Sequence, residues 1–426
     1  MIVKTYHRRW IVVTAATSIN LILGVLYSWG VIGKALVGQW HWTKAQAALP
    51  FTVSTGAFAL TMIFAGKCQD KVGPRYVATL GGIILGAGLM ASSLVHSPIG
   101  MLWTFGLIGG VGIGIGYSAT TPSAIKWFSP SKMGLIAGVV VSGVGLAAVY
   151  MSPLTAWLLG KFDIPSTFLL VGLGALVLVP LLSQFLSNPP VALSQTGNER
   201  RLDPSPEAAT ATREFAWQQM LRSRQFYRLW FMFVLSASAG LMLIMHVPLI
   251  AREQAHVDSW GFWLVAIIAL CNTSGRLVGG VISDRLGRSK TLLLAFLVQA
   301  LNMLAFSHYT TPGLIIFGSA LTGLCYGSIF TLFPAATADF YGLRNLGVNY
   351  GLMFTAFGVA GVSGPYVAGW IRDTFGSYNN AFLLSGGMLL AGCLLIMTMG
   401  PREKNPAFTQ RVNQQNVRVQ LESVAD

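Results

Sequence analysis

Residues 66–75 read Gly-Lys-Cys-Gln-Asp-Lys-Val-Gly-Pro-Arg, and residues 280–288 read Gly-Val-Ile-Ser-Asp-Arg-Leu-Gly-Arg. Each stretch closes a long apolar segment, and their offset, 280 − 66 = 214 residues, is about half of the 426-residue chain. A repeat at half the chain length is typical of a membrane protein built from two related bundles that rock against each other.

The composition also indicates a membrane protein. Apolar residues make up 54% of the chain and charged residues only 10%, with a mean hydropathy of +0.62. These values lie outside the range of a soluble domain. We therefore predict an all-α membrane protein whose twelve transmembrane helices form two pseudo-symmetric six-helix bundles. The predicted spans are 10–36, 45–66, 76–96, 99–124, 134–160, 165–187, 226–250, 260–282, 290–307, 312–338, 346–370 and 379–400.

The predicted domains follow from one long hydrophilic stretch. The segment 188–224 is rich in Pro, Ser and charged residues and cannot build a core, so we interpret it as a cytosolic linker. It separates an N-terminal six-helix bundle, 1–187, from a C-terminal bundle, 225–400, and a cytosolic tail follows at 401–426.

The basic residues predict the orientation. With both termini in the cytosol, 22 of the 28 Lys and Arg residues lie on the cytosolic side, five lie outside and Arg276 lies within a span. This bias explains the net charge of +14 better than nucleic-acid binding, which needs a soluble basic face. We expect a monomeric multi-pass protein of the plasma (inner) membrane.

The sequence shows no chemistry typical of an enzyme. The four cysteines, at 68, 271, 325 and 393, have no paired spacing, so we expect neither a disulfide framework nor a metal site. No nucleophile and base pair and no phosphate-binding loop is apparent, and we predict no cofactor.

Each copy of the repeated loop combines a glycine that allows close helix approach, an aspartate at a helix end and basic residues within one turn. This pattern suits a conformational latch of charge-assisted hydrogen bonds. The alternative is a chance basic loop that only follows the cytosolic bias of positive charge. The candidate latch residues are Gly66, Asp70, Lys71, Arg75, Gly280, Asp284, Arg285 and Arg288.

Arg276 is the main candidate for substrate binding. It lies about two turns, roughly 12 Å, deeper in the eighth span than Asp284, and no carboxylate is near it in sequence. A buried guanidinium without an acidic partner is explained by an organic anion that binds and leaves, and its planar geometry favours a carboxylate. Asn272, one turn away, can orient the arginine or the anion. Alternatively, Arg276 bonds to backbone carbonyls or reaches the cytosolic interface.

Aromatic residues near mid-membrane complete the candidate cavity, although plain packing is the alternative for each. They are Tyr27, Trp29, Tyr117, Tyr326, Phe330, Phe354 and Phe357. His246 is the only histidine that we place within a span, which makes it the candidate for proton coupling. A neutral histidine bonded within the bundle is the alternative.

The two loops resemble the hallmark loops of the major facilitator superfamily, G-x-x-x-D-[RK]-x-G-x-[RK], which follow its second and eighth helices. Within that superfamily the chain is similar to the oxalate:formate antiporters and monocarboxylate transporters. The similarity is carried by Gly24 to Trp29, Lys126-Trp127-Phe128, Ser274-Gly275-Arg276, Leu332 to Ala336, Asn349-Tyr350-Gly351 and Gly364 to Tyr378.

This resemblance implies that Arg276 binds the substrate carboxylate, as the helix 8 arginine does in both families. The chain also departs from both. Phe357 replaces a second cation that the oxalate antiporter has on helix 11, and Asn272 replaces a proton-linked aspartate of the animal carriers. A single fixed charge suits a monoanion better than a dianion.

We therefore expect a secondary transporter of small monocarboxylates such as L-lactate or pyruvate, coupled to protons and working by alternating access. Its partners would be the anion, a proton and the lipid bilayer. The alternatives are an oxalate or formate exchanger and a membrane sensor that binds a carboxylate without moving it.

Overall fold

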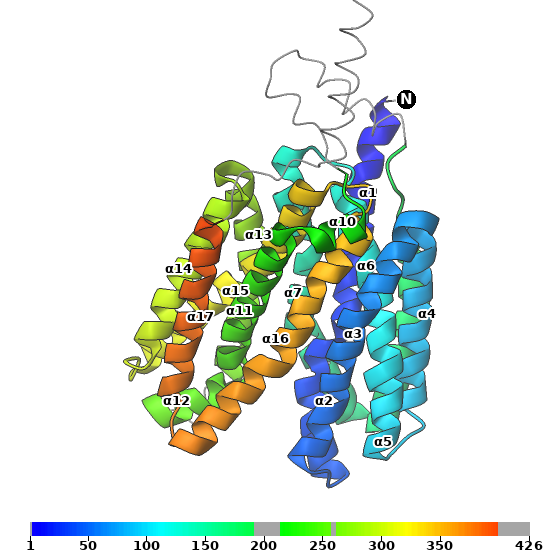
Figure 1. Cartoon of the computed structure of the whole chain (residues 1–426). Helices are drawn as coiled ribbons and strands as arrows, with labels where there is room; N and C mark the ends of the chain where they lie inside the picture. The colour runs from blue at the N-terminus through cyan, green and yellow to red at the C-terminus, as the bar shows by residue number, and fades with distance from the viewer. Residues whose placement is uncertain (1, 191–213, 257–260, 399–426) are drawn as a thin grey trace, which may run out of the picture.

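The computed structural model describes residues 2–190, 214–256 and 261–398 (Figure 1). Within these ranges the chain is helical and contains no strand. Twelve helical spans are long and apolar enough to cross a membrane, which confirms the predicted fold class. The predicted tail and residues 191–213 of the predicted linker lie outside the described residues.

The first six spans form the N-terminal bundle. They comprise α1 (Ile2–Leu23), η1 (Gly24–Ser28) and α2 (Trp29–Gln39); α3 (Lys44–Val72); α4 (Pro74–Ser92); α5 (Pro98–Met101), η2 (Leu102–Gly109) and α6 (Gly110–Ile125); η3 (Pro130–Lys132) and α7 (Met133–Lys161); and α8 (Ile164–Ser183).

The other six spans form the C-terminal bundle, which is preceded by the short helix α10 (Trp217–Arg222) within the predicted linker. The bundle comprises α11 (Arg224–Ile244), followed by the short α12 (Val247–Ala255); α13 (Gly261–Leu286); α14 (Arg288–Phe306); α15 (Pro312–Tyr341); α16 (Leu346–Phe375); and α17 (Asn379–Met397).

The seventh span is shorter than we predicted. We expected a helix over 226–250, but α11 ends at Ile244 and a separate helix begins at Val247. Pro248 explains the break, since it has no N–H to donate to the carbonyl of Ile244 and its ring crowds the preceding turn. The predicted placement of His246 within a span is therefore wrong.

The bundles meet closely at the end that carries the repeated loops 66–75 and 280–288, which we call the motif face. There α3 crosses α16 and α7 crosses α13, and Figure 1 shows α3 and α16 diverging toward the opposite end. A Cβ on Gly66 would overlap the backbone of Gly347, and one on Gly280 would overlap Gly134. Only glycine permits these two approaches.

Candidate functional site

The crossing of α7 and α13 places Arg276 deep in the molecule. A Cβ on Gly138 would overlap the carbonyl oxygen of Arg276, and one on Gly145 would lie 3.3 Å from its Cζ atom. These glycines let the two helices approach, and the Arg276 residue is only 1% exposed. The arginine is therefore removed from bulk solvent.

The guanidinium contacts both bundles. Arg276 Nε donates to Asn272 Oδ1 at 3.2 Å, Nη1 donates to the carbonyl of Val141 on α7, and Nη2 donates to the Tyr27 hydroxyl at 3.4 Å. Its Cζ atom lies 5.1 Å from the centre of the Phe330 ring. A guanidinium has five N–H donors, so two of them remain for another acceptor.

No carboxylate among the described residues forms an ion pair with Arg276. The alternative interpretation is that Arg276 bonds to backbone carbonyls or reaches the cytosolic interface. Its first part is observed, because the side chain donates to the Val141 carbonyl. However, it does not extend to the motif face. Tyr27 lies in η1, a 3₁₀ break within the first span, and is 38% exposed. The tyrosine therefore joins the buried cation to an accessible surface.

Five of the seven predicted aromatic residues form one group of connected rings, and Tyr27 joins it through Arg276. Phe330 packs edge-on against Tyr326 and Phe357, with ring centres 5.1 and 5.2 Å apart, and Phe354 lies 5.5 Å from Tyr117.

Trp29 does not reach this group, so its predicted place is wrong. Its Nε1 donates to the Ala47 carbonyl, and its ring stacks on Phe105 within the N-terminal bundle. Phe58, which was not predicted, takes part instead, with its ring 5.4 Å from Tyr117 and 5.0 Å from Phe354. Phe58 and Tyr117 thus meet Phe354 across the bundle boundary.

His246 lies apart from Arg276, just beyond α11. Its Nδ1 is 3.1 Å from the carbonyl oxygen of Met242, and its ring lies 5.3 Å from Tyr378 at the end remote from the motif face. Burial lowers the pKa of His246 below the usual 6.5. The imidazole is consequently neutral at pH 7.

Asp70 binds the first turn of a helix in the opposite bundle. Its carboxylate accepts the backbone N–H groups of Gly347 and Val348 at the start of α16, at 3.2 and 3.0 Å. Lys126 Nζ lies 3.0 Å from the same carboxylate. An anion at a helix N-terminus is stabilised by free N–H groups and by the helix dipole.

Asp284 makes the corresponding contact from the C-terminal bundle. It accepts the N–H groups of Gly134 and Leu135 at the start of α7, at 2.8 and 2.7 Å. Arg288 donates to Asp284 at 2.7 Å and to Asp339 at 2.8 Å. Both aspartates of the repeat therefore hold the partner bundle by a helix N-terminus.

Arg288 also crosses the boundary between the bundles, because its Nη2 donates to the Pro130 carbonyl at 3.3 Å. The other predicted basic latch residues do not span the bundles. Lys71 and Arg285 are exposed, and Arg75 donates to Gln184 within its own bundle. The receiving glycines, Gly134 and Gly347, were not predicted, although the repeat relates them, since 347 − 134 = 213 residues.

Comparisons with known proteins agree with this architecture. The family model of the Major Facilitator Superfamily matches residues 10–306 and 262–421. The oxalate:formate antiporter of Oxalobacter formigenes is 28% identical, over 93% of both chains, and monocarboxylate transporter 13 of Bos taurus is 22% identical, over 92% of this chain and 89% of that one. An uncharacterized MFS-type transporter of Escherichia coli, YhjX, is 27% identical over 84% and 87%.

Solved structures show the same fold. The human organic anion transporter MFSD10 superposes with a TM-score of 0.70 at 16% identity, covering 91% of this chain and 99% of that one. The transporter FucP in the outward conformation superposes with a TM-score of 0.68 at 16% identity, covering 93% of this chain and 100% of that one. The family match spans most of the chain, and the twelve spans and paired helix crossings fit it. The chain therefore belongs to the major facilitator superfamily and is an integral multi-pass membrane transporter.

Proposed function

We propose that this transporter carries small monocarboxylates such as L-lactate and pyruvate by alternating access, with Arg276 binding the carboxylate. The observation that carries this proposal is a buried guanidinium that has no carboxylate partner among the described residues and keeps two free N–H donors. One N–H remains on each Nη atom, and a guanidinium can donate from two nitrogens to the two oxygens of a carboxylate. The names of two relatives, an oxalate:formate antiporter and a monocarboxylate transporter, support an organic acid as cargo.

The contacts of Arg276 suggest how cargo acts on the bundles. The arginine, which belongs to the C-terminal bundle, donates to Val141 and Tyr27 of the N-terminal bundle. A bound carboxylate competes for these donors and neutralises the charge, which changes the contact between the bundles. Such a difference between states is what a ligand needs to shift a conformational equilibrium.

Proton symport is part of the proposal. The proton travels either on the substrate or on His246, and the lowered pKa of His246 together with its remote position favours the substrate. With the motif face in the cytosol, as the basic residues predict, Asp70 and Asp284 would close the cytosolic side. We expect the protein to act as a monomer in the inner membrane.

Anion exchange is the second candidate, favoured by the oxalate:formate antiporter relative. The site argues for a monoanion, because Phe357, at the position where the resemblance implies a second cation in the antiporter, is apolar here and packs on Phe330. A dianion beside Arg276 alone would leave one net charge buried.

The test is uptake of radiolabelled L-lactate into proteoliposomes, with and without an imposed pH gradient and with oxalate as competitor. Arg276→Ala should abolish saturable uptake, whereas Lys290→Ala, which removes an exposed cation on α14, should not. Saturable uptake by the Arg276 variant would refute its binding role. Counterflow without gradient-driven uptake would favour exchange, and tight binding with weak transport would favour a sensor.

A further inference from the structure

The region between Arg276 and the motif face contains buried side chains with polar atoms that have no hydrogen-bond partner among the described residues. Gln69 on α3, Thr121 on α6, and Asn349 and Tyr350 on α16 are all at most 1% exposed. Among the described residues, no hydrogen bond reaches either end of the Gln69 amide, the Thr121 hydroxyl, Asn349 Oδ1 or the Tyr350 hydroxyl. Of the Asn349 amide only the oxygen is unpartnered, because Nδ2 donates to the Phe215 carbonyl at 3.1 Å. We call these four residues the polar seam.

The polar seam lies where the two bundles close on each other. Gln69 Oε1 faces Gly347, next to the Asp70 contact with α16. Tyr350 lies one turn from Phe354 toward the motif face, and Thr121 lies one turn from Tyr117 in the same direction. Two residues come from each bundle. The polar seam therefore lies between the aromatic rings of Tyr117 and Phe354, next to the arginine site, and the Asp70 contact at the motif face.

The hydroxyls of the seam lie close to the site. The Tyr117 hydroxyl lies near enough to those of Tyr350 and Thr121 for a weak interaction, but neither of those two hydroxyls makes a hydrogen bond of normal length and angle. A buried polar group without a partner disfavours the state that buries it, by about fivefold or more in population. If these residues served only to pack the interface, apolar side chains of the same size would do so without this cost.

We infer that the polar seam lines the route by which the anion moves from Arg276 to the motif face. Its polar groups are unpartnered only while this face is closed, and they bind water and the passing anion when α3 and α6 separate from α16. The seam thereby lowers the stability of the closed state and hydrates the open one. This inference rests on the proposed transport of an anion.

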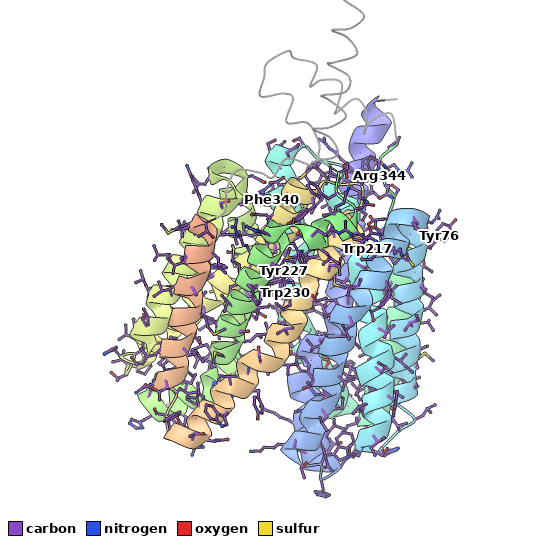
Figure 2. The ribbon with its side chains drawn as sticks, in the orientation of Figure 1. Tyr76, Trp217, Tyr227, Trp230, Phe340 and Arg344 are labelled. Atoms are coloured by element: carbon purple, nitrogen blue, oxygen red, sulfur yellow. The ribbon has the colours of Figure 1, made fainter. Side chains whose placement is uncertain are left out.

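The first test measures the conformational equilibrium without cargo. Spin labels at Tyr76→Cys and Arg344→Cys report the distance between bundles at the motif face, where both side chains are exposed (Figure 2), on a background without the native cysteines. Tyr350→Phe removes only the unpartnered hydroxyl, so the closed population should rise about fivefold relative to the open one. Tyr150→Phe is the matched control, because its hydroxyl already donates to the Leu21 carbonyl.

The second test measures transport. Tyr350→Phe and Thr121→Val should each slow lactate exchange about fivefold and leave equilibrium lactate affinity within about twofold. If Tyr350→Phe changes neither the distance populations nor the exchange rate, the inference is overturned. A parallel loss of affinity and exchange would also overturn it, by placing the hydroxyl in the resting site. If the unaltered protein exchanges no lactate, the proposed cargo is wrong, and the distance populations still decide about the seam.

Discussion

Asp284→Asn should open the motif face, and the size of the effect follows from the contacts of the carboxylate. Asp284 accepts two backbone N–H groups of α7 and one Arg288 N–H, and its side chain is 9% exposed, so water screens these bonds little. Asparagine keeps one acceptor oxygen and turns an NH₂ group toward the second backbone donor. The closed state loses a charged hydrogen bond of about 1.5–3 kcal/mol and a helix-dipole interaction of about 0.3–1 kcal/mol. The sum, about 2–4 kcal/mol, is a roughly 30-fold to 1,000-fold shift in population.

The spin-label pair at Tyr76 and Arg344 measures this shift as a gain of long distances at neutral pH. Asp163→Asn is the control, since Asp163 accepts the Ser166 N–H at the start of its own helix, α8, and links no bundles. Unchanged distance populations in the Asp284 variant, with the protein still folded, would refute a latch that holds α7 by its N-terminus.

Three other changes probe the arginine, the linker and the histidine. Gly145→Ala places a methyl group 2.7 Å from Thr273 Oγ1 and 3.3 Å from the Arg276 guanidinium, so kcat/KM for lactate transport should fall about fivefold or more. Gly174→Ala is the control, because its methyl group points into open space and should change nothing. Burial raises the pKa of Glu214, which accepts the N–H groups of the loop before α16, so docking of residues 214–223 weakens as pH rises above about 4.5. Hydrogen exchange there should be slower at pH 5.5 than at pH 7.5 after correction for intrinsic rates, and Glu214→Gln should remove the difference. His246 has a lowered pKa and stays neutral above pH 6.5, so His246→Gln should retain uptake driven by a pH gradient, and loss of that uptake would assign the proton to the histidine.

The sequence predicted what depends on local pattern. Hydropathy located the twelve spans, and the repeat offset located the two bundles, because both signals are contained in windows of about 20 residues. Arg276 was recognisable because a charge within an apolar window needs a reason. The helix break before Pro248 was also local, but the apolar run through 250 obscured it.

The partners of these residues could not be predicted in the same way. Asp70 and Asp284 bind backbone N–H groups more than 140 residues away in sequence. Every residue except proline has such a group, so the residue types do not show which one is the donor. An α-helical period does not predict which face of the first span each residue occupies beyond η1, since a 3₁₀ stretch turns 120° per residue rather than 100°. For that reason Tyr27 reaches Arg276 while Trp29 packs within its own bundle.

The two crossings at the motif face are not equivalent, and this leads to a final prediction. On α7, the latch at Gly134 and the Arg276 acceptor at Val141 are seven residues apart, about 10 Å along one helix. The α3 and α16 crossing has its own aspartate, Asp70, but the cation paired with it, Lys126, lies beside the latch at the motif face. Cargo that displaces Val141 therefore acts on the helix that Asp284 holds. Lactate should shift the spin-label distances less in the Asp284→Asn variant than in the Asp70→Asn variant. Equal shifts in both variants would show that cargo acts on both crossings alike, and not through α7.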